Sequence, residues 1–127
     1  QRADRDRLVV NVVGNGSHLF ANPVVCHQVA KANDLPVLTV VLNNAGWDAV
    51  RLSALEVYPD GVTSGLDQVP LTEFGANPDH RRVAEACGLW ARRVDRAEDL
   101  PAVLEEAAKV IRDKRLPVLV DVAVRPE

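Results

Sequence analysis

The sequence lacks the features that mark several common classes of protein. Its two cysteines, Cys26 and Cys87, lie far apart and form neither a CxxC pair nor a disulfide framework, so we expect two small buried side chains in a reducing cytoplasm. No apolar run approaches the roughly 20 residues that a membrane span requires. Basic residues are not in excess, because 15 Lys and Arg against 18 Asp and Glu give a net charge of −3. We therefore expect no membrane partner and no nucleic-acid partner.

The composition that remains is that of one globular domain. With 127 residues, 47% hydrophobic and 26% charged, the chain is long enough for a single core and too short for two. It begins with Gln1 rather than methionine, and residues 1–7 are a charged stretch without the apolar core of a signal peptide. We expect an internal start, so that residues 1–127 are one domain truncated at its N-terminus.

Strand-like and helix-like segments alternate along this domain. Four short segments rich in branched apolar side chains predict buried strands: residues 8–13, 35–42, 89–94 and 116–124. Four segments with helical spacing predict helices: residues 21–33, 45–55, 79–88 and 99–114. This alternation predicts a three-layer α/β fold, with a mostly parallel sheet and helices on both of its faces.

Several local expectations follow from single residues. Asp79 and Asp99 are placed to cap helices, and Gly88 is placed to end one. In the helix at 21–33, Val25 and Val29 lie on the apolar stripe. Residues 57–78 are rich in proline and glycine and predict a long loop that covers a site.

Two polar turns follow the first two predicted strands, at the end of a parallel sheet where ligands bind. The first, GNGS from Gly14, aims backbone amides at one point, as a phosphate site does. The second begins with Asn43 and Asn44, whose neutral oxygens suit magnesium. Ordinary turns with glycine and capping asparagine are the alternative. A dinucleotide site is disfavoured, because Leu19 stands where its third glycine belongs and no acid follows the second strand.

The two turns together resemble the cofactor motif of thiamine diphosphate-dependent enzymes. That motif is a GDG triplet followed, some two dozen or more residues later, by NN. Here GNGS precedes LPVLTVVLNNAGW, and residues 17–42, 26 in all, separate Gly16 from Asn43. The likeness extends over essentially the whole chain. It is greatest to the C-terminal, diphosphate-binding domain of acetolactate synthases, benzoylformate decarboxylases and related 2-oxo acid enzymes.

The resemblance implies a role for each residue of the motif. Metal ligands would come from Asn15, from Asn44 and from the backbone carbonyl of Gly46. The diphosphate would be contacted by the same turns, at Gly14, Gly16, Ser17, Asn44, Gly46 and the backbone around Trp47. Val50 would face the substrate, although packing within its helix is nearly as good an interpretation. Pyruvate decarboxylases carry an acid at that position, and valine transfers no proton, so a carboligase or an enzyme of larger substrates is favoured.

The resemblance also implies the wider setting of the domain. The cofactor supplies the chemistry of a lyase or transferase that decarboxylates or joins 2-oxo acids. In the family, a separate pyrimidine-binding domain, usually from a neighbouring subunit, completes the site. We therefore expect a homo-oligomeric enzyme and no turnover by the isolated chain.

Asn15 departs from the family pattern, because an aspartate normally stands there. The change keeps an oxygen ligand and removes one negative charge, which should weaken magnesium binding. A working site with weaker metal affinity, a non-catalytic degenerate domain and a generic nucleotide-binding module all stay open. Deamidation at Asn15-Gly16 would restore an aspartate.

Other polar residues carry weaker hypotheses. His18, His27 and His80 show no metal-binding spacing, and His18 is the one placed to donate to a phosphate. We interpret the pairs Arg81-Arg82 and Arg92-Arg93 as solvated surface rather than anion sites.

Overall fold

A computed structural model describes residue 4, residues 7–73 and residues 78–124. In these parts of the chain four strands form one sheet, namely β1 (Val9–Gly14), β2 (Val37–Asn43), β3 (Trp90–Val94) and β4 (Val118–Ala123). The strand order is β1-β2-β4-β3, and every neighbouring pair is parallel. The expected charged start at residues 1–7 lies mostly outside the described residues.

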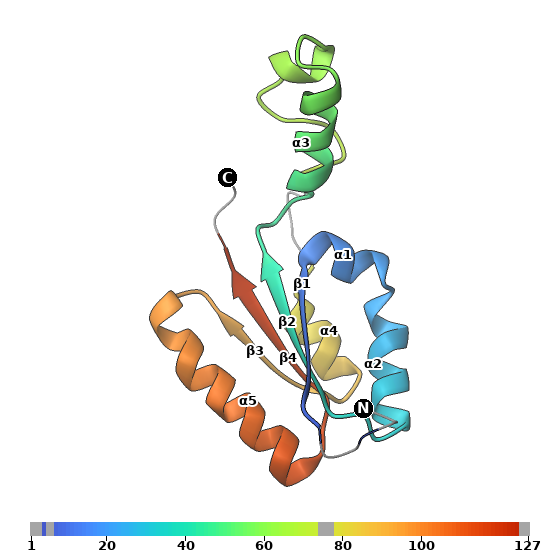
Figure 1. Cartoon of the computed structure of the whole chain (residues 1–127), viewed down its shortest axis with the longest axis vertical. Helices are drawn as coiled ribbons and strands as arrows, with labels where there is room; N and C mark the ends of the chain where they lie inside the picture. The colour runs from blue at the N-terminus through green and yellow to red at the C-terminus, as the bar shows by residue number, and fades with distance from the viewer. Residues whose placement is uncertain (1–3, 5–6, 74–77, 125–127) are drawn as a thin grey trace.

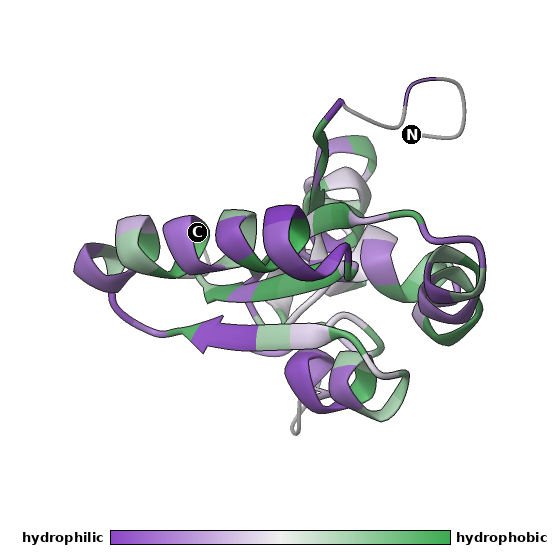
Figure 2. Ribbon diagram, turned by 90° about the horizontal axis from the view of Figure 1, so that it is seen from below, coloured by the Kyte–Doolittle hydropathy of each residue, from purple (hydrophilic) through white to green (hydrophobic). Residues whose placement is uncertain are grey.

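Helices cover both faces of the sheet, which confirms the predicted three layers (Figure 2). On one face α5 (Leu100–Lys114) packs Ala107, Val110 and Ile111 against β2 and β4. The other face carries α1 (Asn15–Phe20), α2 (Pro23–Ala32) and α4 (His80–Ala86), where Ala84 packs on Val41 and Leu119. None of the helices in the described ranges is both long and apolar enough to cross a membrane.

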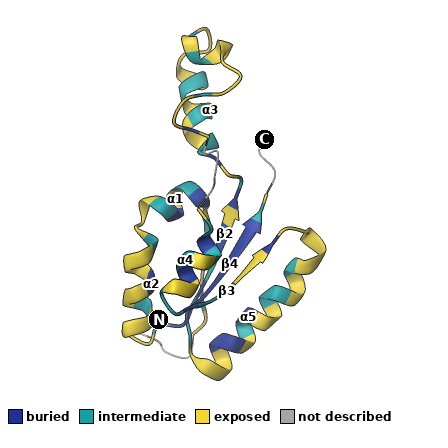
Figure 3. Ribbon diagram, turned by 180° about the vertical axis from the view of Figure 1, so that it is seen from behind, coloured by how far each residue is buried: buried dark blue, intermediate teal, exposed yellow. Residues whose placement is uncertain are grey.

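The helix α3 (Asp48–Val57) stands apart from these layers. It projects beyond the carboxyl ends of the strands and none of its residues is buried (Figures 1 and 3). The helix begins three residues later than the sequence predicts. The predicted loop that follows contains a short 3-10 helix (Val62–Gly65), while Gly75 of that loop lies outside the described residues.

The predicted helix at 21–33 is wrong in its bounds and in its buried face. Asn22 adopts a left-handed conformation, with φ of 53°, and Pro23 then opens α2, so the turn and the helix form two short helices. Val25 and Val29 are about half exposed, whereas the buried residue of α2 is His27. The buried face of α2 therefore carries a polar side chain, whose ring lies beside that of His18 in α1.

Two further expectations of burial are also corrected. Val10 and Val12 of β1 are 49% and 60% exposed, because β1 lies at the edge of the sheet and its apolar side chains are only partly covered. Cys26 is exposed and Cys87 is half-buried. Of the four strands in the described residues, β4, which is internal to the sheet, is the one buried along almost its whole length (Figure 3).

The helix ends follow the predictions in two of three cases. Asp79 caps α4 by accepting from the backbone amide of Arg82 at 2.9 Å. Gly88, just beyond α4, has a φ of +79°, which favours glycine. Asp99 directly precedes α5 but makes no capping hydrogen bond with its side chain, because its backbone is already helical.

Candidate functional site

The two predicted turns meet at the carboxyl ends of β1 and β2. Gly14 ends β1 beside Leu42, one residue before Asn43 ends β2. A cavity of about 330 Å³ opens there. All of the cofactor, metal and substrate residues predicted from the sequence line it: Gly14, Asn15, Gly16, Ser17, Asn44, Gly46, Trp47 and Val50.

Asn15, the first residue of α1, connects the two turns. Its side chain is 3% exposed, and its Nδ2 atom donates to the backbone carbonyl of Gly46 at 3.2 Å. The two groups come from residues 31 positions apart in the chain. The pair of turns is thus held together by the residue that departs from the family motif.

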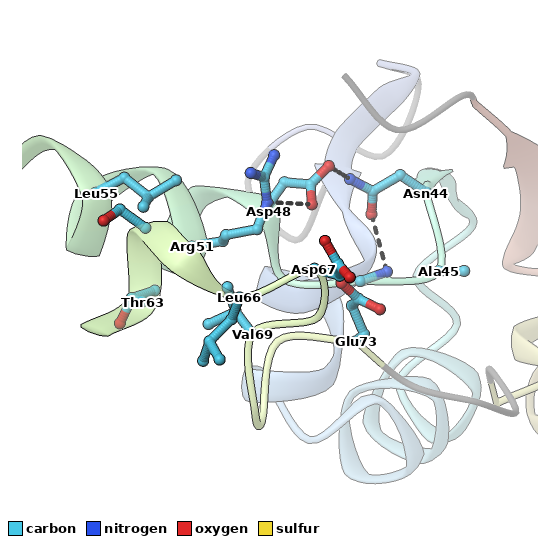
Figure 4. A pocket seen from close by; sticks show the side chains of 12 residues that line it. Asn44, Ala45, Asp48, Arg51, Leu55, Thr63, Leu66, Asp67, Val69 and Glu73 are labelled. Carbon is cyan, nitrogen blue, oxygen red and sulfur yellow. Dashed lines mark hydrogen bonds and ion pairs between the residues drawn. The ribbon is translucent and has the colours of Figure 1, made fainter. Parts of the chain in front are cut away.

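Asn44 is fixed by a short polar chain at the start of α3. Its Nδ2 atom donates to Oδ2 of Asp48 at 2.8 Å, and its Oδ1 atom accepts from the backbone amide of Gly46 at 3.2 Å (Figure 4). The other oxygen of Asp48 lies 3.7 Å from Nε of Arg51. These contacts fix which way the Asn44 amide is turned. Because a carboxylate accepts hydrogen bonds and donates none, the amide nitrogen faces Asp48 and the amide oxygen faces Gly46.

Asn43 links this turn to the buried strand β4 by hydrogen bonds. Its Nδ2 atom donates to Oδ1 of the fully buried Asp121 in β4 at 2.9 Å, and its Oδ1 atom accepts from the amide of Ala45 at 3.1 Å. Asp121 also accepts from Arg93 of β3 at 3.1 Å. Arg93 is exposed at the surface, as the sequence predicts, but it also forms an ion pair with this buried carboxylate, which the sequence did not predict.

Trp47 walls the cavity with its ring. The ring stacks on Phe20 with centroids 5.1 Å apart, and it lies so close to Gly16 that an added Cβ there would be 2.9 Å from Cδ1 of Trp47. The backbone amide of Trp47 donates to the carbonyl of Thr72 at 2.7 Å. Glycine is needed at residue 16 to admit the indole.

Val50 lies in the second turn's helix and reaches the same cavity. It is 51% exposed, so it is not a core residue of α3, and the alternative interpretation of Val50 as helix packing is wrong. The cavity wall at this point is apolar, with Leu42 and Val124 beside Val50.

A second cavity of about 570 Å³ adjoins the first between α3 and residues 63–73. It shares Asn44, Gly46 and Asp48 with the first cavity and adds the carboxylates of Asp67 and Glu73 (Figure 4). An isolated antiparallel bridge joins Gly46 to Glu73. The predicted loop thus returns to the site and borders this second cavity.

The three histidines gather elsewhere. His18 of α1 lies between His27 of α2 and His80 of α4, with ring centroids 5.6 and 5.1 Å away. All three side chains are buried. Burial, reinforced by the neighbouring imidazoles, lowers the pKa of His18 to about 4. The hypothesis that His18 reaches a phosphate is not supported, since it does not line the 330 Å³ cavity. Within the described ranges no three His, Cys, Asp or Glu residues are grouped to hold a metal.

Sequence reasoning missed two residues that shape the site. Asp48 could have been found, because it follows Asn44 by four residues at the start of the helix after the second turn. Thr72 offers no such signal, since it lies 25 residues from Trp47 in the chain and contributes a backbone carbonyl.

The chain is similar to several known proteins. The family described as "Thiamine pyrophosphate enzyme, C-terminal TPP binding domain" matches residues 1–122. A glyoxylate carboligase of Escherichia coli O157:H7 is 30% identical over 122 residues, which are 94% of this chain and 20% of that protein. A thiamine diphosphate-dependent 4-hydroxybenzoylformate decarboxylase of Rhodococcus jostii RHA1 has the same fold, with a TM-score of 0.78 at 24% identity over the whole chain and 21% of that structure. The chain thus spans about a fifth of the length of these relatives.

Proposed function

Because the chain belongs to the family of C-terminal, thiamine pyrophosphate-binding enzyme domains, we propose that it holds the diphosphate end of thiamine diphosphate together with a magnesium ion. The observation that carries the proposal is the single cavity lined by both turns of the motif. Residues 1–127 would act as one domain of a 2-oxo acid decarboxylase or carboligase. An acetolactate synthase-like enzyme of the lyase or transferase type fits the motif best, and the two free cysteines, Cys26 and Cys87, suit the cytoplasm.

The residues of the two turns suit a magnesium ion. The Nδ2 atom of Asn15 lies 3.2 Å from the carbonyl oxygen of Gly46. Rotation of the Asn15 amide about its Cβ–Cγ bond would exchange its nitrogen and oxygen, and would place two oxygens side by side at about this distance. Adjacent ligands of an octahedral magnesium ion, each about 2.1 Å from the metal, are roughly 3 Å apart. Asn44 adds a third oxygen, and magnesium usually completes its shell with waters and phosphates.

Gly14 provides room for an anion. A Cβ placed on Gly14 would meet no atom of the chain within 4 Å, although its φ of −69° and ψ of 153° suit any residue. Neither the backbone conformation nor packing explains the glycine. We attribute it to close approach of the diphosphate, with Gly16 and Ser17 following on the same turn.

The bound cofactor supplies an electron sink for decarboxylation. This chain's own part is to position the cofactor and to present an apolar wall, at Val50 and Leu42, to a 2-oxo acid substrate. A pyrimidine-binding domain, on the same or another subunit of an oligomer, would complete the site. We therefore expect the isolated chain to bind without turning over substrate.

A thermal shift experiment tests the proposal directly. Thiamine diphosphate should raise the melting temperature only when magnesium is present, and the rise should grow with ligand excess. Asn15→Asp should lower the magnesium concentration needed, because it restores the charge of the family motif. Stabilisation by NAD in place of thiamine diphosphate would favour a nucleotide-binding module. If none of these ligands stabilises the wild type or Asn15→Asp, the result would favour the alternative suggested by Asn15, a degenerate, non-catalytic domain.

A further inference from the structure

The 330 Å³ cavity has one ionisable residue in its wall. Of the residues that line it in the described parts of the chain, only Asp48 carries a charge, and Asn15, Asn44 and the Gly46 carbonyl are neutral. Oxygen sites for divalent ions are tuned by the number of charged ligands. The negative charge of Asp48 could therefore strengthen cation binding by the three neutral ligands.

Asp48 is bound to one member of that set. Its Oδ2 atom accepts from Nδ2 of Asn44 at 2.8 Å, and its side chain is 21% exposed, so water competes little for the contact (Figure 4). Because the carboxylate only accepts, it holds the Asn44 amide with its nitrogen toward α3 and its oxygen toward the Gly46 turn. Arg51 lies 3.7 Å from the other carboxylate oxygen, too far for a strong charge-assisted hydrogen bond.

We propose that Asp48 is the positioning residue that offsets the charge missing at Asn15, by orienting Asn44 and polarising its oxygen toward the magnesium ion. The inference rests on the function proposed above. Groups that hydrogen-bond a metal ligand orient it and increase its basicity, and their loss typically weakens metal binding by about 10- to 100-fold. Asp48 thus acts through Asn44 and does not itself touch the cofactor.

The test is a magnesium titration at fixed thiamine diphosphate on the 127-residue chain. The readout is the ligand-induced rise in melting temperature, measured against each variant's own ligand-free value, so that a general loss of stability does not imitate weak binding. Asp48→Asn removes the charge and keeps an acceptor for Asn44. We expect it to raise the magnesium concentration at half effect by about 10-fold or more.

Three further variants make the assignment specific. Asp67→Asn makes the same change of charge in the adjoining cavity without touching Asn44, and should leave the magnesium midpoint where it is. Asn15→Asp combined with Asp48→Asn should recover most of the lost affinity, because the charge returns on the other turn. Asp48→Glu, which keeps the charge, should keep more affinity than Asp48→Asn. Peptide mass spectrometry should find residue 15 still an asparagine in the wild-type sample.

The outcomes distinguish a failure of the role proposed for Asp48 from a failure of the proposed function. If wild-type protein binds magnesium and thiamine diphosphate and Asp48→Asn binds them equally well, the inference is overturned and the proposed function stands. The same holds if Asp67→Asn is as damaging as Asp48→Asn, or if the bound fraction of the wild type carries aspartate at residue 15. If neither the wild type nor Asn15→Asp responds to the two ligands, the proposed function is overturned, and the inference with it.

Discussion

Asn43 at the end of β2 donates from Nδ2 to Oδ1 of Asp121, in the middle of β4, across 2.9 Å. Asp121 is fully buried, and its second oxygen accepts from Arg93 on the opposite neighbouring strand. The same Asn43 side chain accepts from the amide of Ala45. A buried charge in the sheet is therefore connected to the turn that carries Asn44 and Gly46, so changes in this network should affect both stability and the site.

Arg93→Met should destabilise the chain. It removes the cation beside the buried Asp121 and leaves Asn43 as the other side-chain hydrogen-bond partner of that carboxylate among the described residues, at a cost of about 3 kcal/mol in the free energy of unfolding. Urea unfolding measures this. Arg96→Met is the matched control, since the partners of Arg96 among the described residues are the exposed carboxylates of Glu98 and Asp99, and it should change stability by less than about 0.5 kcal/mol. Equal effects of the two substitutions would show that Asp121 does not depend on Arg93.

Gly16→Ala should disturb Trp47. The new Cβ would lie 2.9 Å from Cδ1 of the indole, which is enclosed by Phe20 on its face, so the ring must move. Overpacking of this kind costs about 1 to 3 kcal/mol. Chemical unfolding gives the cost, and tryptophan fluorescence reports the displacement of the ring. An unchanged emission spectrum with unchanged stability would contradict the packing described for this turn.

Gly14→Ala should separate binding from stability. Its Cβ meets nothing in the chain and its backbone is extended, so the free protein should be unchanged or more stable by about 0.5 kcal/mol through a less flexible unfolded chain. Magnesium-dependent stabilisation by thiamine diphosphate should nevertheless fall, because the methyl group occupies the space assigned to the diphosphate. Gly65→Ala, also in open space but away from the cavity, is the control. Full ligand response of Gly14→Ala would argue against that placement of the diphosphate.

The sheet could be predicted from the sequence because its signals are local. Runs such as Val37–Leu42 and Val118–Ala123 are branched, apolar and bounded by proline and polar turns, so both strands appear where expected. The site could be predicted because the carboxyl ends of parallel strands bring successive turns together. The resemblance to the cofactor motif then identified eight of the residues that line the cavity, but not Asp48.

The parts that could not be predicted depend on long-range neighbours. Periodicity assigned the apolar side chains of α2 to the core, yet α2 buries His27, whose ring lies beside that of His18 in α1, and His18 in turn lies beside His80 in α4. The apolar run of β1 did not indicate that β1 is an edge strand, because the position of a strand in the sheet depends on the strand order. Arg93 likewise has a buried partner only because β3 pairs with β4, 28 residues further along the chain.

The histidine cluster should make stability depend on pH. Burial lowers the pKa of His18 to about 4 and also lowers the pKa of His27, with the neighbouring imidazoles adding to both shifts. Burial lowers the pKa of His80 as well; Asp121 and Asp79 oppose that shift, and Arg93 adds to it. Below pH 6.5, about the value for an unfolded chain, the unfolded state therefore binds protons that the folded state excludes.

The free energy of unfolding should accordingly be highest above about pH 6.5 and fall as the pH drops toward about 4, by up to about 1.4 kcal/mol per pH unit for each excluded proton. Urea unfolding between about pH 5 and 7 isolates this effect, since most carboxylates stay ionised there. His18→Leu should make the curve shallower by about one proton, because one excluded protonation is removed while the cluster stays filled. Lys114→Leu, a substitution at an exposed cation near the far end of α5, should leave the slope alone. A slope unchanged by His18→Leu, or stability that rises as the pH falls, would contradict the burial of neutral histidines.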